Sequence, residues 1–74
     1  MLHTGDEGYA VVLLQNGLHN CGYEPGKSDG LFSDQTRLAL KRLQIYHGIN
    51  PSGIYCENSE EVLKNEVKNN WRRR

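Results

Sequence analysis

Two segments of the chain repeat one another, and each reads as a turn followed by the start of a helix. Residues 27–40 read KSDGLFSDQTRLAL, and residues 50–63 read NPSGIYCENSEEVL. In both, a turn pair (Asp29-Gly30 or Ser52-Gly53) precedes two apolar residues and a periodic apolar segment. A bundle of three helices needs two such connections, so the repeat predicts three helices.

The spacing of apolar residues predicts where these helices lie: residues 9–21, residues 34–47, and residues 57–67 or beyond. Glycine follows the last periodic residue of the first two segments, as it does at many helix ends. No segment shows the sustained alternation of a strand. We therefore predict an all-α fold, a compact three-helix bundle with two Asp/Ser-Gly loop repeats. Its predicted core consists of Val11, Leu14, Leu18, Phe32, Ala39, Leu40, Leu43, Ile54, Val62 and Leu63.

The apolar pair after each turn is expected to close one end of this core. Leu31 and Phe32 would close the first end, and Ile54 and Tyr55 the opposite end. Ser33 is expected to cap the second helix.

The chain has room for one domain, which we assign to residues 5–69, with residues 70–74 as a basic tail or linker stub. The formal net charge is zero, and basic charge is concentrated only in the terminal WRRR, so we expect neither a nucleic-acid nor a membrane partner. Trp71 either extends the apolar stripe of the third helix or lies beyond the domain. Residues 1–7 lack the basic flank and apolar stretch of a signal peptide.

The two cysteines, Cys21 and Cys56, end the first predicted helix and begin the third. In an up-down-up bundle these positions lie at opposite ends, farther apart than the Cα separation of about 4.4–6.8 Å that a disulfide tolerates. We expect no disulfide between them, with Cys21 at a core position.

The order of these residues resembles the peptidoglycan-binding-domain-like modules of bacterial and phage cell-wall hydrolases. That family has a pattern of the form G-x-x-V-x-x-L-Q-x-x-L-x-x-x-G-Y, then D-G-x-F-G-x-x-T-x-x-A-V-x-x-F-Q, then G-L and a second D-G-x-x-G-x-x-T-x-x-x-L. The corresponding residues here are Gly8, Val11, Leu14-Gln15, Leu18, Gly22-Tyr23, Asp29-Gly30, Phe32, Thr36, Ala39-Leu40, Leu43-Gln44, Gly48-Ile49, Gly53, Ser59 and Leu63.

The second copy departs from this pattern more than the first. Ser52 replaces the second aspartate, Ser59 the second threonine, and Cys56 a glycine. Ser33 also stands where the family has glycine, and Leu43 replaces an aromatic residue. Any function that depends on the second loop is therefore in question.

The resemblance implies a compact three-helix fold and a non-catalytic module that holds a tethered hydrolase near peptidoglycan. The ligand would be the glycan or the stem peptide of that polymer. The module would then work outside the cell or in the cell wall, as a monomeric part of a larger protein. A second interpretation is a protein–protein or regulatory docking module of the parent enzyme that has lost wall binding.

Five residues have the side chains that such a ligand needs: aromatic faces for sugar rings, and amide or carboxyl groups for acetamido and peptide groups. They are Tyr23, Asp29, Gln44, Tyr46 and Tyr55. Each also has a structural interpretation. Asp29 can lock its own turn, Gln15 and Gln44 can satisfy loop backbone groups, and Tyr23 can pack or cap. Tyr46 and Tyr55 are the stronger candidates for exposed rings.

Motifs of catalysis and metal binding are not found in the sequence. His3, His19 and His47 lack metal-ligand spacing, and no G-x-S-x-G or H-E-x-x-H motif occurs. We expect no cofactor, no metal and no catalytic residue in this chain.

Overall fold

The computed structural model describes the backbone of residues 1–72 and the side chains of residues 1–69. Three helices follow one another: α1 (Tyr9–Asn20), α2 (Asp34–Tyr46) and α3 (Glu57–Arg72). The predicted all-α fold is confirmed: within residues 1–72 the only bridges are the isolated pairs Leu2–Tyr55 and Glu7–Leu31. No helix in this part of the chain is both long and apolar enough to cross a membrane. The predicted tail, Trp71 included, lies outside the residues whose side chains are described.

The helices end where the sequence predicts. Gly22 and Gly48 adopt positive φ angles of 84° and 71°, which glycine reaches without the steric cost that a Cβ brings. The next amide in each case donates back into the helix, from Tyr23 to the Leu18 carbonyl at 2.9 Å and from Ile49 to that of Gln44 at 2.8 Å. These are Schellman caps.

The start of α2 is also as predicted. The Ser33 Oγ accepts a hydrogen bond from the Thr36 backbone N–H at 3.2 Å. This bond satisfies one of the amides that the first helical turn leaves without a partner.

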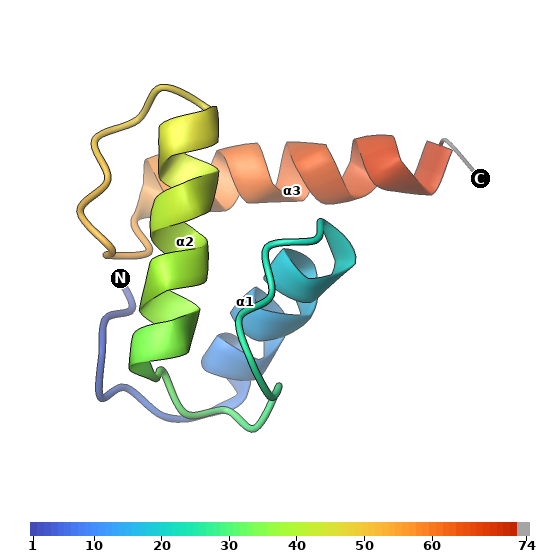
Figure 1. The fold of residues 1–74 in the computed structure, drawn as a ribbon. Helices are drawn as coiled ribbons and strands as arrows, with labels where there is room; N and C mark the ends of the chain where they lie inside the picture. Colours follow the sequence, from blue (N-terminus) through green and yellow to red (C-terminus); the bar gives the residue numbers. More distant parts are fainter. Residues whose placement is uncertain (73–74) are drawn as a thin grey trace.

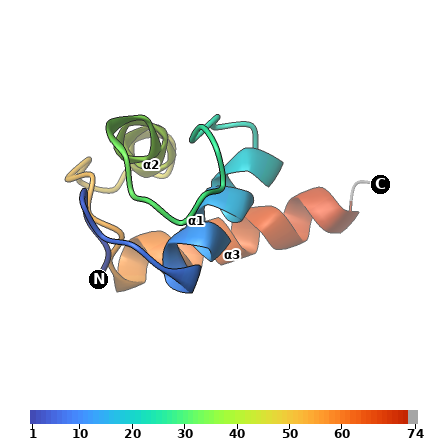
Figure 2. The ribbon, with the colours of Figure 1, turned by 90° about the horizontal axis from the view of Figure 1, so that it is seen from below.

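Each helix contacts the other two. α1 and α3 lie beside one another in both views, and α2 runs across α3 (Figures 1 and 2). The core fills the space between them and contains Val11, Leu14, Leu18, Phe32, Ala39, Leu40, Leu43 and Leu63, all predicted. Val62, also predicted, is partly buried against this core.

The prediction for Ile54 is wrong, because its side chain is 39% exposed. Leu31, expected to help close the first end, is likewise 44% exposed, whereas Phe32 is buried. Successive side chains of an extended segment point to opposite sides, so only one residue of each pair can face inward. Phe32 and Tyr55 are those residues, and each packs on the core.

The N-terminal segment joins the two loops, which the sequence did not predict. Leu2 and Tyr55 exchange backbone hydrogen bonds at 3.1 and 2.8 Å. Farther along, Gly5 donates to the Phe32 carbonyl at 3.0 Å, and Gly8 donates to that of Gly30 at 2.9 Å. Residues 2–8 therefore link both connections to the start of α1.

No disulfide joins Cys21 and Cys56, as predicted. Cys21 follows the last residue of α1 and packs partly buried against the core, whereas Cys56 precedes α3. The helices do not run in the up-down-up order from which this was predicted, because α2 crosses α3, but the end of α1 still lies apart from the start of α3 (Figure 1).

Candidate functional site

The first loop is held by Gln15, a fully buried side chain of α1. Its Oε1 accepts from the Gly30 N–H at 3.0 Å, and its Nε2 donates to the Leu31 carbonyl at 2.8 Å and to Thr36 Oγ1 at 3.1 Å. We call this set the Gln15 anchor. One side chain thus fixes both the turn and the first turn of α2.

The second loop is held in the same way by Gln44 of α2, also fully buried. Its Oε1 accepts from the Gly53 N–H at 3.0 Å, and its Nε2 donates to the Ile54 carbonyl at 3.0 Å and to Ser59 Oγ at 2.9 Å. This Gln44 anchor matches the Gln15 anchor bond for bond. The second copy has therefore kept the geometry of the first despite its substitutions.

Asp29 and Ser52 occupy equivalent positions in the two turns. Asp29 Oδ1 accepts from the Leu31 N–H at 3.0 Å, and Ser52 Oγ accepts from the Ile54 N–H at 3.2 Å. The bond from Leu31 holds the pKa of Asp29 below its ordinary value. Both side chains therefore bond within their own turns, as the structural interpretation of Asp29 predicts.

Tyr23 and Tyr46 lie at a second cluster, which ties the ends of α1 and α2 to α3. The Tyr23 hydroxyl donates to Glu66, 3.0 Å from both carboxylate oxygens, and His47 Nε2 lies 2.8 Å from Glu66 Oε2. Burial, followed by the Glu66 carboxylate, raises the pKa of Tyr23 well above its ordinary value, so this phenol remains a neutral donor. Tyr46 is 75% exposed and meets the His47 ring edge-on.

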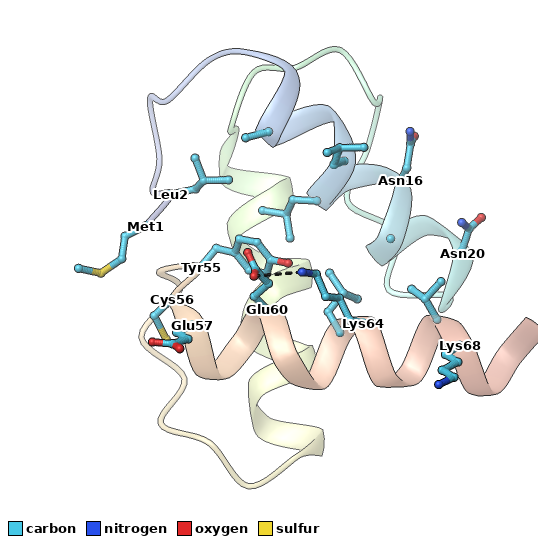
Figure 3. A pocket seen from close by; sticks show the side chains of 16 residues that line it. Met1, Leu2, Asn16, Asn20, Tyr55, Cys56, Glu57, Glu60, Lys64 and Lys68 are labelled. Atoms are coloured by element: carbon cyan, nitrogen blue, oxygen red, sulfur yellow. Dashed lines mark hydrogen bonds and ion pairs between the residues drawn. The ribbon is translucent and has the colours of Figure 1, made fainter.

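Tyr55 lies in a groove of about 1060 Å³ between α1 and α3, which we call the α1–α3 groove. Figure 3 shows Tyr55 between the two helices, with Asn16 and Asn20 along α1 and Lys64 and Lys68 along α3. The other residues that line it are Met1, Leu2, Ala10, Leu13, Leu14, Gly17, Cys56, Glu57, Glu60, Leu63 and Val67.

The base of this groove is apolar and tightly packed. A Cβ on Gly17 would lie 3.1 Å from Leu63 Cδ2, so glycine allows α1 and α3 to approach closely. Burial, with a smaller contribution from Glu60, raises the pKa of Tyr55 to about 12. The groove therefore presents a neutral phenol beside an apolar base and a rim of amides and charges.

The five predicted site residues do not form one site. Tyr55 lines the groove, Tyr23 donates to Glu66, and Tyr46 contacts the His47 ring. The side chains of Asp29 and Gln44 bond within the two loops. Apart from the core residues Leu14 and Leu63, the groove residues of α1 and α3 were not predicted from the sequence. Their one signal was the helical spacing of Leu13, Asn16, Gly17 and Asn20 along α1.

Comparison with known families decides the identity of the fold. The model described as "Putative peptidoglycan binding domain" matches residues 7–56, most of the chain and both turns. The chain belongs to the peptidoglycan-binding domain family. The predicted family is thus confirmed, and this peptidoglycan-binding domain is a binding module and not a catalytic one.

A solved structure supports the assignment. The peptidoglycan-binding domain is similar to the structure titled "The crystal structure of SleB N-terminal domain", at 29% sequence identity and a TM-score of 0.86. The match covers 89% of this chain and 90% of that one. It therefore extends beyond the residues of the family match, into α3.

Proposed function

We propose that this peptidoglycan-binding domain anchors a cell-wall hydrolase, to which it is tethered, and that the wall polymer enters the α1–α3 groove. One observation carries the choice of surface. The groove is the place where an apolar base, the Tyr55 phenol and the Asn16 and Asn20 amides meet along one continuous depression. Ligand sites combine apolar surface with a few polar groups in this way.

The proposed setting is the bacterial cell wall, outside the cytoplasm, with the domain acting as a monomeric part of a larger protein. A single small module has limited contact area, so its own affinity should be modest. Tethering makes binding and catalysis intramolecular, and the resulting effective concentration offsets that weakness. A role in binding for Tyr23, Asp29, Gln44 and Tyr46 stays a prediction.

A second candidate function is docking onto the parent enzyme, and the exposed face of α2 favours it. Leu38 and Ile45 of that helix are 50% and 64% exposed, and Tyr46, next to Ile45 in sequence, is 75% exposed. Apolar side chains repeated along one helix can form a protein interface.

Two matched variants distinguish these functions, because each replaces one exposed leucine with glutamate and so adds one carboxylate at that position. Leu13, 54% exposed, lines the groove, whereas Leu38 lies on α2 and does not. In co-sedimentation with purified sacculi, we expect the wild-type chain and Leu38→Glu to pellet and Leu13→Glu to remain in solution. Circular dichroism would verify that both variants fold.

The opposite result has a clear meaning. If Leu13→Glu pellets like wild type, the groove is not the binding surface. If the wild-type chain does not pellet at all, wall binding itself is refuted. Loss of capture of the parent catalytic domain by Leu38→Glu alone would then support docking. Tyr23→Phe and Tyr46→Ala, measured in the same assay, test the remaining predicted aromatic residues.

A further inference from the structure

We infer that the stem peptide of peptidoglycan, and not its sugar rings, occupies the α1–α3 groove. This inference rests on the proposed function and adds the chemical class of the ligand segment. The observation behind it is the order of charges on the α3 wall. Glu57 and Glu60 line the half of the groove nearer the start of α3, and Lys64 and Lys68 line the other half.

The facing wall carries no charge. α1 contributes Ala10, Leu13, Asn16, Gly17 and Asn20 to the groove. A ligand lying there meets amides and apolar atoms on one side and an ordered row of charges on the other (Figure 3). Asn side chains both donate and accept hydrogen bonds, as an extended peptide backbone does.

The stem peptide has complementary chemistry. It carries free carboxylates on its glutamyl and terminal residues, and its third residue is a diamino acid with a free amine in many walls. The carboxylates fit the lysine half of the groove, and the amine fits the glutamate half. Glu57 and Lys68 stand about 16 Å apart along the helix axis. An extended chain of about five residues spans the same length.

The glycan fits this surface less well. Sugar rings stack on exposed aromatic faces, but among the described side chains, those of residues 1–69, Tyr55 is the one aromatic residue that lines the groove, and its ring is half buried against the core. The freely exposed rings of Tyr9 and Tyr46 do not line it. A glycan whose lactyl groups are amidated by stem peptides has no ionised group for the lysines.

The Glu60–Lys64 ion pair does not block such a ligand. Its 3.2 Å contact joins side chains that are 49% and 73% exposed. Exposed pairs of this kind are worth at most about 1 kcal/mol, so either member can change partner. The same order of charges also suits the dipole of α3, so the test must report ligand binding and not helix stability.

A competition experiment tests the inference. The chain is bound to intact sacculi and challenged with free N-acetyl-L-alanyl-γ-D-glutamyl-diaminopimelyl-D-alanine, or with glycan strands stripped of peptide by an amidase and then amidated at the lactyl carboxylates that this frees. We expect the tetrapeptide to release the chain and the stripped strands to leave it bound. Release by stripped strands, or failure of the tetrapeptide to release it, would overturn the inference while wall binding stands. Failure to bind intact sacculi refutes the proposed function instead.

Charge variants then test the orientation. Lys68→Gln should weaken tetrapeptide binding about two- to fivefold, and Lys27→Gln, away from the groove, should not. Glu57→Gln should weaken binding similarly, and its neighbour Glu61→Gln, outside the lining, should not.

Acetylation of the diaminopimelyl amine of the tetrapeptide tests whether the effect of Glu57→Gln on binding depends on that amine. It should abolish the difference between wild type and Glu57→Gln, because the amine is the group that the Glu57 carboxylate is proposed to meet. A difference that persists with the acetylated peptide, or equal effects of Lys68→Gln and Lys27→Gln, would contradict the assignment.

Discussion

Replacing Gln15 with leucine should remove a large part of the stability of the fold. Leucine keeps similar volume in the core but cannot bond to the loop. The Gly30 N–H and the Leu31 carbonyl, 3.0 and 2.8 Å from the amide of Gln15, would lose their partner. So would Thr36 Oγ1, although it also donates to the Pro25 carbonyl at 3.1 Å.

The size of the effect follows from these groups. A buried polar group left without a partner costs about 1–3 kcal/mol, and two backbone groups are affected, so we expect a loss of about 2–6 kcal/mol. Domains have about 0.05–0.15 kcal/mol of stability per residue, which gives about 4–11 kcal/mol for a chain of 74 residues. The variant should therefore lose roughly half of its free energy of unfolding.

Urea denaturation followed by circular dichroism would measure this loss. Thermal melting should show a fall in Tm of about 10 °C or more, at about 4–8 °C per kcal/mol. The matched control is Gln35→Leu, where an exposed amide makes one 3.4 Å contact to the Glu24 carbonyl; we expect a change within about 0.5 kcal/mol there. Amide exchange at Gly30 should accelerate in Gln15→Leu more than exchange at Gly53. A loss under about 1 kcal/mol would show that the Gln15 anchor does not hold the loop.

Three other predictions follow from the same structure. Phe32→Ala should cost about 3–5 kcal/mol in urea denaturation, because the ring is buried in the core; an unchanged midpoint would refute its packing role. Asp29 has a folded-state pKa below its ordinary value of 3.8, so its stabilising contribution is complete above that value and is lost as the pH falls through the folded pKa. Asp29→Asn should therefore show a shallower fall in Tm below about pH 4, and parallel pH profiles would contradict this. Removing residues 70–74 should leave Tm nearly unchanged if the domain ends at residue 69, whereas removing residues 1–4 should lower it, because two backbone bonds between Leu2 and Tyr55 are lost. An equal Tm for both truncations would show that the N-terminal segment adds no stability.

The parts of the fold that the sequence predicted are those with local causes. Glycines with positive φ angles follow the ends of α1 and α2, and the Ser33 side chain caps the start of α2. The two matching loops could be predicted because the same order of turn residues and apolar residues occurs twice in the sequence. That Gln15 and Gln44 can bond to loop backbone groups was likewise one interpretation of the sequence, because a glutamine amide has both a donor and an acceptor for the backbone of a turn.

The parts that were missed depend on contacts between distant residues or on a choice between neighbours. The bonds of Leu2 with Tyr55 are made by backbone atoms, which leave no mark in the residue pattern. The pairing of His47 with Glu66 joins two helices. For Leu31 and Ile54, each apolar pair is too short for its alternation to show which member faces the core.

The two anchors also explain how a groove between the first and third helices keeps its shape. Gln15 of α1 fixes the loop that positions the start of α2, and Gln44 of α2 fixes the loop that positions the start of α3. The position of α3 beside α1 therefore depends on both anchors, because the Gln15 anchor positions α2 relative to α1 and the Gln44 anchor positions α3 relative to α2. If the second loop had lost this geometry, the start of α3 would lie elsewhere, and with it the end of the groove that Glu57 lines. Ser59 keeps the hydroxyl oxygen of the threonine that it replaces, and Ser52 supplies a side-chain oxygen to the turn in place of the aspartate carboxylate. The substitutions therefore changed the residue pattern without changing the bonds that hold α3 against α1.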